Sequence, residues 1–254
     1  MVAVGRVEGP SPSSARQGAA RVVPRPALFE RLGAAARVTV VSAPPGSGKT
    51  VLLRSWVAEA GLARHAAWVA AGRDERDPPR FWLSVLQALG GTGPGAQLVR
   101  EVTSAPDLVG WALVERLLED LAALEERLWL VVDDVHELGS TEAMRQLGLL
   151  VMRAPPTLRF VLATRHDVRL GLHRLRLEGE LAEIRAADLR FSVAEAAELL
   201  KGAGVELPGP ALTALHERTE GWAAGLRPGD LRLAQHRQDP RRPPVRQARH
   251  ASPG

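Results

Sequence analysis

The sequence predicts an α/β fold in which a parallel central sheet lies between two helical layers, followed by the start of a small helical domain. Short apolar runs rich in β-branched residues alternate with segments of helical periodicity, which is typical of a parallel sheet covered on both faces. A glycine-rich turn joins the first of these runs directly to a helical segment. Beyond about residue 190 only helical patterns remain.

The elements follow from local signals. The first strand, VTVVS at 38–42, is short, apolar and β-branched, as expected of a buried parallel strand. Proline at position 26 suits the first turn of a helix, and Ser192 with Glu195 forms a capping-box pattern. The expected strands are 38–42, 65–70, 128–132, 158–163 and 181–185. The expected helices are 26–32, 50–60, 80–89, 107–126, 141–152, 192–201 and 208–219.

The glycine-rich turn contains one of only two lysines, against 31 arginines. The turn reads APPGSGKT from Ala43 to Thr50, and it matches a phosphate-binding loop, or P-loop, except that Ala43 replaces the first glycine. The lysine of such a loop reaches the β- and γ-phosphates, and the next hydroxyl holds Mg²⁺. We therefore expect a P-loop NTPase three-layer sandwich that binds ATP or ADP with Mg²⁺. The expected nucleotide-binding residues are Pro45, Gly46, Ser47, Gly48, Lys49, Thr50 and Val51.

Two carboxylates end the apolar strand LWLVV. Asp133 fits the Mg²⁺-binding carboxylate that a P-loop enzyme needs on a neighbouring strand, together with Thr50. Asp134 could orient or deprotonate the attacking water; a solvated acidic turn is the plain alternative. His136 follows, and a loop histidine without a named partner is more often structural. If strand 158–163 lies between the first strand and the Asp133 strand, Arg165 emerges beside the γ-phosphate; otherwise it is a surface arginine.

These motifs resemble a known family, the STAND signal-transduction ATPases, and most closely the MalT-like LuxR-family transcriptional regulators of bacteria. The matching stretches are PALFERL, VVSAPPGSGKTVLL, AAWVAAGRDERDPPRFW, WLVVDDVHEL, LATRHDVRLGLHRLRLEGELAEIRAADLRFS and TEGWAAGL, and Ala43 is common in that family. The resemblance implies a switch that holds ADP at rest, exchanges it for ATP and then self-associates, with slow Mg²⁺-dependent hydrolysis. It also implies that Arg165 is a sensor arginine, that Val23 and Pro24 lie near adenine, and that 221–226 closes over the nucleotide.

Composition sets the expected organisation. Residues 1–22 are Pro/Ser/Gly/Ala-rich and expected to be flexible, 23–190 to form the nucleotide-binding domain, and 191–226 a partial helical domain. Residues 227–254 hold seven Arg and two Asp and are expected to be a disordered basic tail. The resemblance ends at Leu226, so we expect a truncated or frameshifted regulator in which DNA binding would require a C-terminal domain absent from these residues. A short protein with a basic tail is the alternative.

Two further function classes stay open. A P-loop phosphotransferase would need an acceptor pocket and an arginine-rich lid, and no lid-like insertion stands out. The other class is a protein that binds nucleic acid through its basic tail, although no helix-turn-helix or aromatic platform is evident. The chain has no cysteine, no apolar run near the ~18 residues of a membrane span and no signal-peptide pattern at its start. The expected location is therefore the cytoplasm.

Overall fold

The computed structural model describes residues 22–72, 77–96, 110–168 and 170–226. These residues divide into two compact units. The larger unit holds Val22–Phe191 together with Trp222–Ala224, and the smaller unit holds Ser192–Gly221 with residues 225–226. Residues 1–21 of the expected flexible segment 1–22 lie outside the described residues, and so does the expected basic tail 227–254. The domain boundaries drawn from the sequence stay predictions.

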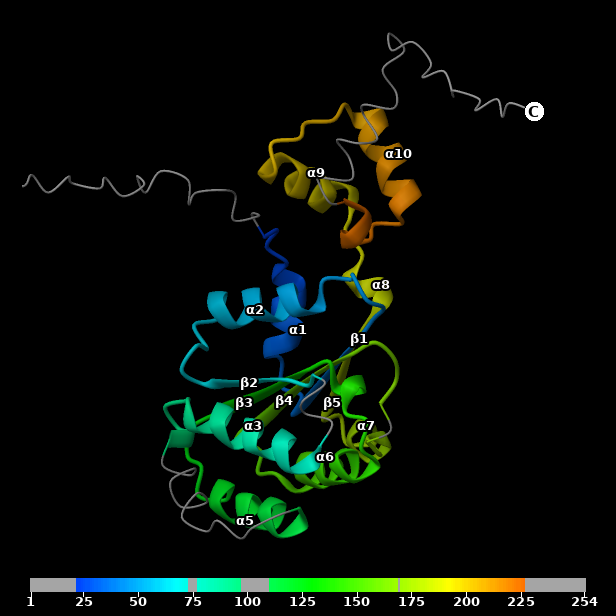
Figure 1. Ribbon diagram of the computed structural model, residues 1–254. Coiled ribbons are helices and arrows are strands. Elements are labelled where there is room, and N and C mark those ends of the chain that lie inside the picture. The colour runs from blue at the N-terminus through cyan, green and yellow to red at the C-terminus, as the bar shows by residue number, and fades with distance from the viewer. Residues whose placement is uncertain (1–21, 73–76, 97–109, 169, 227–254) are drawn as a thin grey trace, which may run out of the picture. The chain divides into compact units, whose positions relative to one another are not determined.

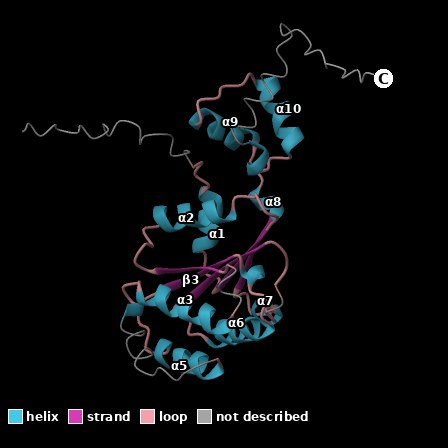
Figure 2. Cartoon of the chain, in the orientation of Figure 1, coloured by secondary structure: helices cyan, strands magenta, loops and turns pink. Residues whose placement is uncertain are grey.

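The centre of the larger unit is a sheet of five parallel strands in the order β2-β3-β4-β1-β5 (Figures 1 and 2). The strands were expected in these places because apolar, β-branched runs suit a sheet buried on both faces. Each expected strand is present, with bounds that differ by at most one residue. The strands are β1 (Val38–Ser42), β2 (Ala66–Ala70), β3 (Leu128–Asp133), β4 (Leu158–Thr164) and β5 (Leu181–Arg185).

Helices cover both faces of this sheet, which confirms the three-layer α/β prediction. Alternate strand residues belong to different apolar clusters, because successive side chains of a strand point to opposite faces. In β4, Phe160 packs with α3, α5 and α6, whereas Val161 packs with α1 and α2. The helices of this unit are α1 (Pro26–Gly33), α2 (Lys49–Glu59), α3 (Pro78–Gly90), α5 (Trp111–Leu121), α6 (Thr141–Arg153), α7 (His173–Leu177) and α8 (Ala186–Leu189).

The strand order decides which loops meet. β4 lies between β1 and β3, and Ser42 of β1 is level with Thr164 of β4. Val132 of β3 is level with Leu162 of β4. Because all strands are parallel, the loops after β1, β3 and β4 emerge at the same edge of the sheet. In open α/β sheets this carboxyl edge is where ligands bind.

One expected helix is too long. The expectation for 107–126 was a single helix, but α5 ends at Leu121, and residues 107–109 lie outside the described residues. After Leu121 the hydrogen bonds shorten to the three-residue spacing, with Ala123 N–H bonded to Asp120 O and Leu124 N–H to Leu121 O. Leu124 still buries its side chain in the main cluster. The apolar spacing therefore extends beyond the helix, because a leucine in the turn after a helix can be buried as well as one within it.

The smaller unit contains α9 (Val193–Gly202) and α10 (Gly209–Thr219). Ser192 caps α9: its hydroxyl accepts from Glu195 N–H, and the Glu195 carboxylate accepts from Ser192 N–H. This is the capping box expected from the sequence. Leu200 and Val205 form a small apolar cluster with Leu207, Leu212 and Leu215. A short 3₁₀ helix, η3, spans Ala223–Leu226.

Candidate functional site

The glycine-rich turn joins β1 to α2 at the carboxyl edge of the sheet. Gly46 and Gly48 have φ angles of +77° and +88°. This left-handed region is energetically unfavourable for residues that have a Cβ atom. Ala43 stands where the common pattern has glycine, and its side chain is buried among the apolar residues of β1, α2 and β4. Its N–H donates to Thr164 O at 3.2 Å. Alanine therefore fits this position, because it has a methyl group to bury and no left-handed φ.

Lys49 begins α2, with 7% of its surface exposed. Its Nζ donates to the carbonyl oxygens of Ala43 at 2.7 Å and Pro44 at 3.1 Å. Burial lowers the pKa of Lys49, and the carboxylates of Asp134 and Asp133 act in the opposite direction. The ammonium is thus held inside the loop by two carbonyl groups. A bound phosphate could take their place as the hydrogen-bond acceptor of Lys49.

The Thr50 hydroxyl lies next to the carboxylate at the end of β3. Its Oγ1 donates to Asp133 Oδ2 at 2.7 Å, and Asp133 Oδ1 accepts from the N–H of Asp134 at 3.0 Å. Asp133 is only 3% exposed. A threonine hydroxyl and a carboxylate are oxygen ligands of the kind that Mg²⁺ prefers. This donor pair fits a Mg²⁺ ion, which would supply positive charge to the phosphates beside Lys49.

Ser47 supplies a second test of whether the loop fits phosphate. Its hydroxyl oxygen is buried and has no hydrogen-bond partner. A buried polar atom without a partner is unusual in a folded protein and calls for an explanation. Ser47 stands two residues before the start of α2, and the N-terminus of a helix favours anions. The residues present therefore fit a bound polyphosphate.

Asp134 and Arg165 both act on the phosphate-loop lysine. The negative charge of Asp134 raises the pKa of Lys49, whereas the positive charge of Arg165 lowers it. Arg165 follows β4, which lies between β1 and β3, the arrangement that we set as the condition for placing it beside the γ-phosphate. The structure thus brings Lys49, Thr50, Asp133, Asp134 and Arg165 to one edge of the sheet.

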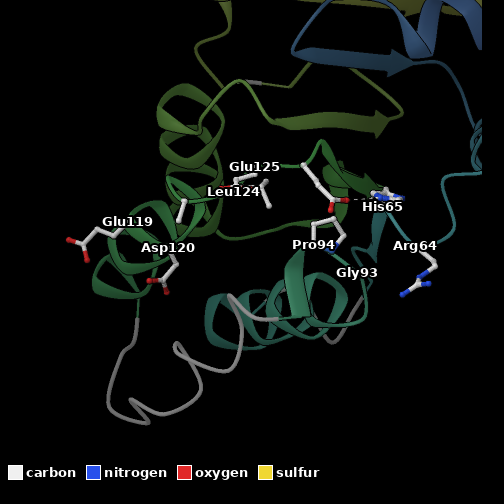
Figure 3. A pocket seen from close by; sticks show the side chains of 10 residues that line it. Arg64, His65, Gly93, Pro94, Glu119, Asp120, Leu124 and Glu125 are labelled. Atoms are coloured by element: carbon white, nitrogen blue, oxygen red, sulfur yellow. Dashed lines mark hydrogen bonds and ion pairs between the residues drawn. The ribbon is translucent and has the colours of Figure 1, made fainter.

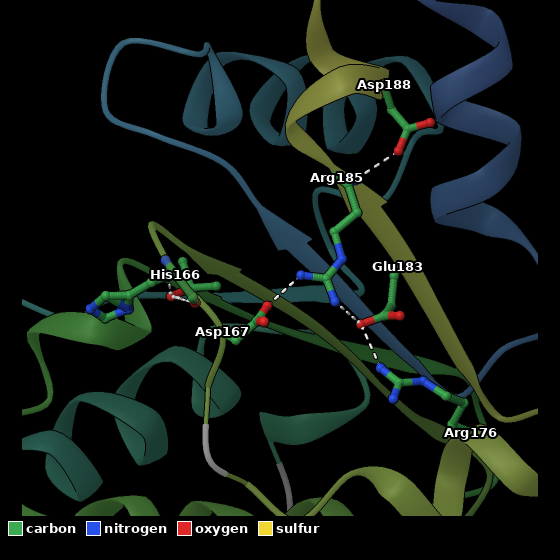
Figure 4. A network of polar contacts seen from close by, with 7 residues as sticks. His166, Asp167, Arg176, Glu183, Arg185 and Asp188 are labelled. Carbon is green, nitrogen blue, oxygen red and sulfur yellow. Dashed lines mark hydrogen bonds and ion pairs between the residues drawn. The ribbon is translucent and has the colours of Figure 1, made fainter.

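The loop that carries Arg165 is tied to the neighbouring strands. Thr164 Oγ1 donates to His166 O at 2.8 Å, which tightens the turn directly after β4. Asp167 accepts from Arg185 at the end of β5, and Arg185 also donates to Glu183 at 2.6 Å (Figure 4). This connection has no sequence signal, because an Asp–Arg pair 18 residues apart shows no periodicity.

The residues expected near adenine occupy mixed environments. Val23 is buried, Pro24 is exposed, and Val51 is 52% exposed on α2. Arg25, next in the chain, donates to the carbonyl oxygens of Leu189 at 2.8 Å and Arg190 at 2.9 Å. These bonds join the N-terminal segment to the last residue of α8 and the residue after it. Their contact with adenine stays a prediction.

The Trp222–Ala224 segment packs on the phosphate loop, although it is far away in sequence. A Cβ built on Gly46 would lie 2.9 Å from Ala224 Cβ, and one on Gly48 would lie 3.8 Å from Ala223 Cβ. The guanidinium of Arg190 lies 5.3 Å from the centre of the Trp222 ring. The family resemblance implied that 221–226 closes over the nucleotide; this segment does pack on the phosphate loop, and its contact with nucleotide stays a prediction.

A cavity of about 850 Å³ lies elsewhere, before β2 and β3 (Figure 3). This is the amino end of the strands, opposite to the phosphate loop. His65 Nε2 lies 3.2 Å from Glu126 Oε2 within its lining. The lining includes the carboxylates of Glu119, Asp120, Glu125 and Glu126, which would repel a polyphosphate. The cavity is therefore not a second candidate for the nucleotide.

Comparison with known proteins agrees with this geometry. Residues 33–170 match the family model described as AAA domain. The chain is 31% identical over 209 residues to the serine/threonine-protein kinase PknK of Mycobacterium tuberculosis, covering 80% of this chain and 19% of PknK. It is 26% identical over 211 residues to the HTH-type transcriptional regulator MalT of Cronobacter sakazakii, covering 80% of this chain and 23% of MalT. The expected resemblance to MalT is confirmed, and the chain spans about a fifth of each relative.

Among solved structures, the crystal structure of Cdc6p from Pyrobaculum aerophilum matches with a TM-score of 0.48 and 16% identity, covering 78% of this chain and 54% of that one. Within the part of the chain that the structure describes, no helix is both long and apolar enough to cross a bilayer. The family match covers β1, the phosphate loop and the Asp133 strand together. On this match and this site, the chain belongs to the AAA domain family and carries a P-loop ATPase module related to MalT-like regulators.

Proposed function

We propose that the chain is the ATP- and ADP-binding switch module of a MalT-like transcriptional regulator in the bacterial cytoplasm. The observation that carries the proposal is the 2.7 Å contact between Thr50 Oγ1 and Asp133 Oδ2 beside the buried Lys49 ammonium. It joins the two expected Mg²⁺ ligands, one from the first turn of α2 and one from the end of β3, next to the cation that would hold the phosphates. A structural hydrogen bond alone would need neither the lysine nor the orphaned Ser47 hydroxyl nearby.

Each residue has a stated role in this proposal. Lys49 and the loop from Pro45 to Val51 hold the phosphates, and Thr50 with Asp133 holds Mg²⁺. Asp134 accepts a proton from the attacking water during slow hydrolysis, and Arg165 senses the γ-phosphate. Val23 and Pro24 lie near adenine. In the ATP state the module self-associates, and DNA is contacted only through a separate C-terminal domain of a complete regulator.

The test is to purify the protein, denature it and identify the nucleotide released. Lys49→Ala should weaken ADP affinity by about tenfold to a hundredfold, because hydrogen bonds to charged groups contribute ~1.5–3 kcal/mol and each ~1.4 kcal/mol is tenfold in affinity. The chain offers a matched control: its other lysine, Lys201, is exposed at the end of α9. Lys201→Ala should leave the affinity unchanged. Equal affinity in wild type and Lys49→Ala would refute the proposal.

Hydrolysis separates this function from a phosphotransferase. A switch module should release inorganic phosphate slowly in Mg²⁺ and water alone. A phosphotransferase would hold its γ-phosphate until an acceptor is added.

A further inference from the structure

The His136 side chain is buried in a way that its sequence context does not explain. It lies in the 3₁₀ turn η2 (Val135–Glu137) directly after Asp134, and only 7% of the side chain is exposed. Both ring nitrogens are inaccessible to water, and neither makes a hydrogen bond. A buried polar group without a partner destabilises the folded state, whereas an apolar side chain of similar shape would not. Histidine at this position therefore lowers the free energy of unfolding.

Two carboxylates flank the ring at distances just too long for hydrogen bonds. His136 Nδ1 lies 3.9 Å from Asp134 Oδ1, and Nε2 lies 3.5 Å from Glu137 Oε1. Burial, followed by the positive charge of Arg165, lowers the pKa of His136, so the ring is neutral near pH 7. A neutral imidazole has one N–H, and a carboxylate only accepts. The ring can therefore serve one carboxylate at a time.

The His136 ring shares two charged neighbours with the lysine of the candidate nucleotide site. Asp134 acts on the pKa of both Lys49 and His136, and so does Arg165. His136 also makes an edge-to-face contact with His166, with ring centres 5.5 Å apart. Asp134 itself has a left-handed backbone, with φ 56° and ψ 39°. The imidazole Nδ1 lies 3.9 Å from that carboxylate and has no hydrogen-bond partner, so a proton on this nitrogen is available to Asp134.

We propose that His136 is a positioning residue that donates its Nδ1–H to Asp134 when nucleotide is bound and thereby aims the carboxylate at the attacking water. A shift of about 1 Å would shorten the 3.9 Å separation to an ordinary N–H···O distance. The inference rests on the proposed function. In hydrolysis the water oxygen bonds to the γ-phosphorus as the bond to the β–γ bridging oxygen breaks, and Asp134 accepts the proton that the water loses. His136 exchanges no proton in this step.

Three substitutions at position 136 test this role. The amide nitrogen of asparagine can occupy the place of Nδ1, that of glutamine the place of Nε2, and phenylalanine keeps the ring without either nitrogen. His136→Phe and His136→Gln should lower Mg²⁺-ATP turnover roughly tenfold or more, since a correctly placed general base contributes about 10²–10⁴-fold. His136→Asn should retain turnover within about threefold. ADP affinity should stay within about twofold in all three variants.

A double-mutant cycle shows whether the ring acts through Asp134. Residues that act as a unit are not additive, so His136→Phe combined with Asp134→Asn should be no slower than Asp134→Asn alone. His166→Phe is the matched control, because it preserves the edge-to-face contact, and its turnover should equal that of the wild type. Urea unfolding should show His136→Phe at least as stable as the wild type.

The outcomes separate the inference from the proposed function. Wild type that binds ADP but shows no turnover above Lys49→Ala rejects the inference and leaves nucleotide binding in place. Equal turnover in all three variants, additive effects in the cycle, or a loss of stability that asparagine does not restore would each reject it as well. Failure of wild type to bind ADP would instead reject the proposed function.

Discussion

The packing of Ala224 on the phosphate loop leads to a prediction that can be worked out in numbers. In Gly46→Ala the new Cβ would lie 2.9 Å from Ala224 Cβ, at a backbone φ of +77°. A left-handed conformation costs a non-glycine residue roughly 1–2 kcal/mol, and overpacking adds about 1–3 kcal/mol. We expect a total destabilisation of about 2–5 kcal/mol.

Gly48→Ala is the matched control for the backbone cost. Its φ is +88°, but its Cβ would lie 3.8 Å from Ala223 Cβ, an ordinary contact. It should therefore lose only the roughly 1–2 kcal/mol of the left-handed conformation. The difference between the two variants isolates the contact between the loop and the 222–224 segment.

Ala224→Gly should relieve the clash in Gly46→Ala without changing the backbone strain. We expect the double variant to be about 1–3 kcal/mol more stable than the sum of the single effects, which is a positive coupling. The assay is urea unfolding of the four proteins, read as free energies at constant slope. A coupling of zero would show that Ala224 does not pack on the phosphate loop.

Two further predictions concern charged groups of the site. Asp133→Asn should leave Mg²⁺-free ADP binding unchanged but weaken Mg²⁺ affinity. The loss should be at least roughly tenfold, which is the cost of losing an outer partner of a metal ligand. Titration calorimetry with and without EDTA measures this, and an unchanged Mg²⁺ dependence would show that Asp133 does not bind the metal. Burial lowers the pKa of His136 from its usual 6.5, so the unfolded chain binds a proton at this ring more readily than the folded chain. Keeping the ring neutral therefore favours the folded state fully above about pH 6.5, and this stabilisation is lost as the pH falls below that value. His136→Phe should therefore show a smaller loss of unfolding free energy than wild type between pH 7 and pH 5, and parallel curves would contradict this.

The strands were predictable because their signals are local. Strand β4, for example, is an apolar run, and it spans Leu158–Thr164 in the structure against 158–163 in the prediction. Helix bounds were less certain where burial continued beyond the helix. Leu124 is buried in the core but lies in a turn, so apolar spacing alone extended the predicted helix too far.

The site was predictable where the motif itself carries the chemistry. Lys49, Thr50 and Asp133 follow from residue type and from their place at the end of a strand or the start of a helix. His136 did not follow, because a histidine in a loop is ordinary by sequence. Its significance comes from two ring nitrogens that the fold buries without partners.

One of the two lysines, in a chain with 31 arginines, could be assigned from the residues alone to a phosphate-binding loop between a strand and a helix. This was possible because the pattern of a glycine-rich turn with that spacing lies within a few consecutive residues. The folded chain was needed to place β4 between β1 and β3, the Thr50 hydroxyl on Asp133 and Ala224 against Gly46. These facts depend on strand order and on contacts between residues far apart in the chain, which local propensity does not specify.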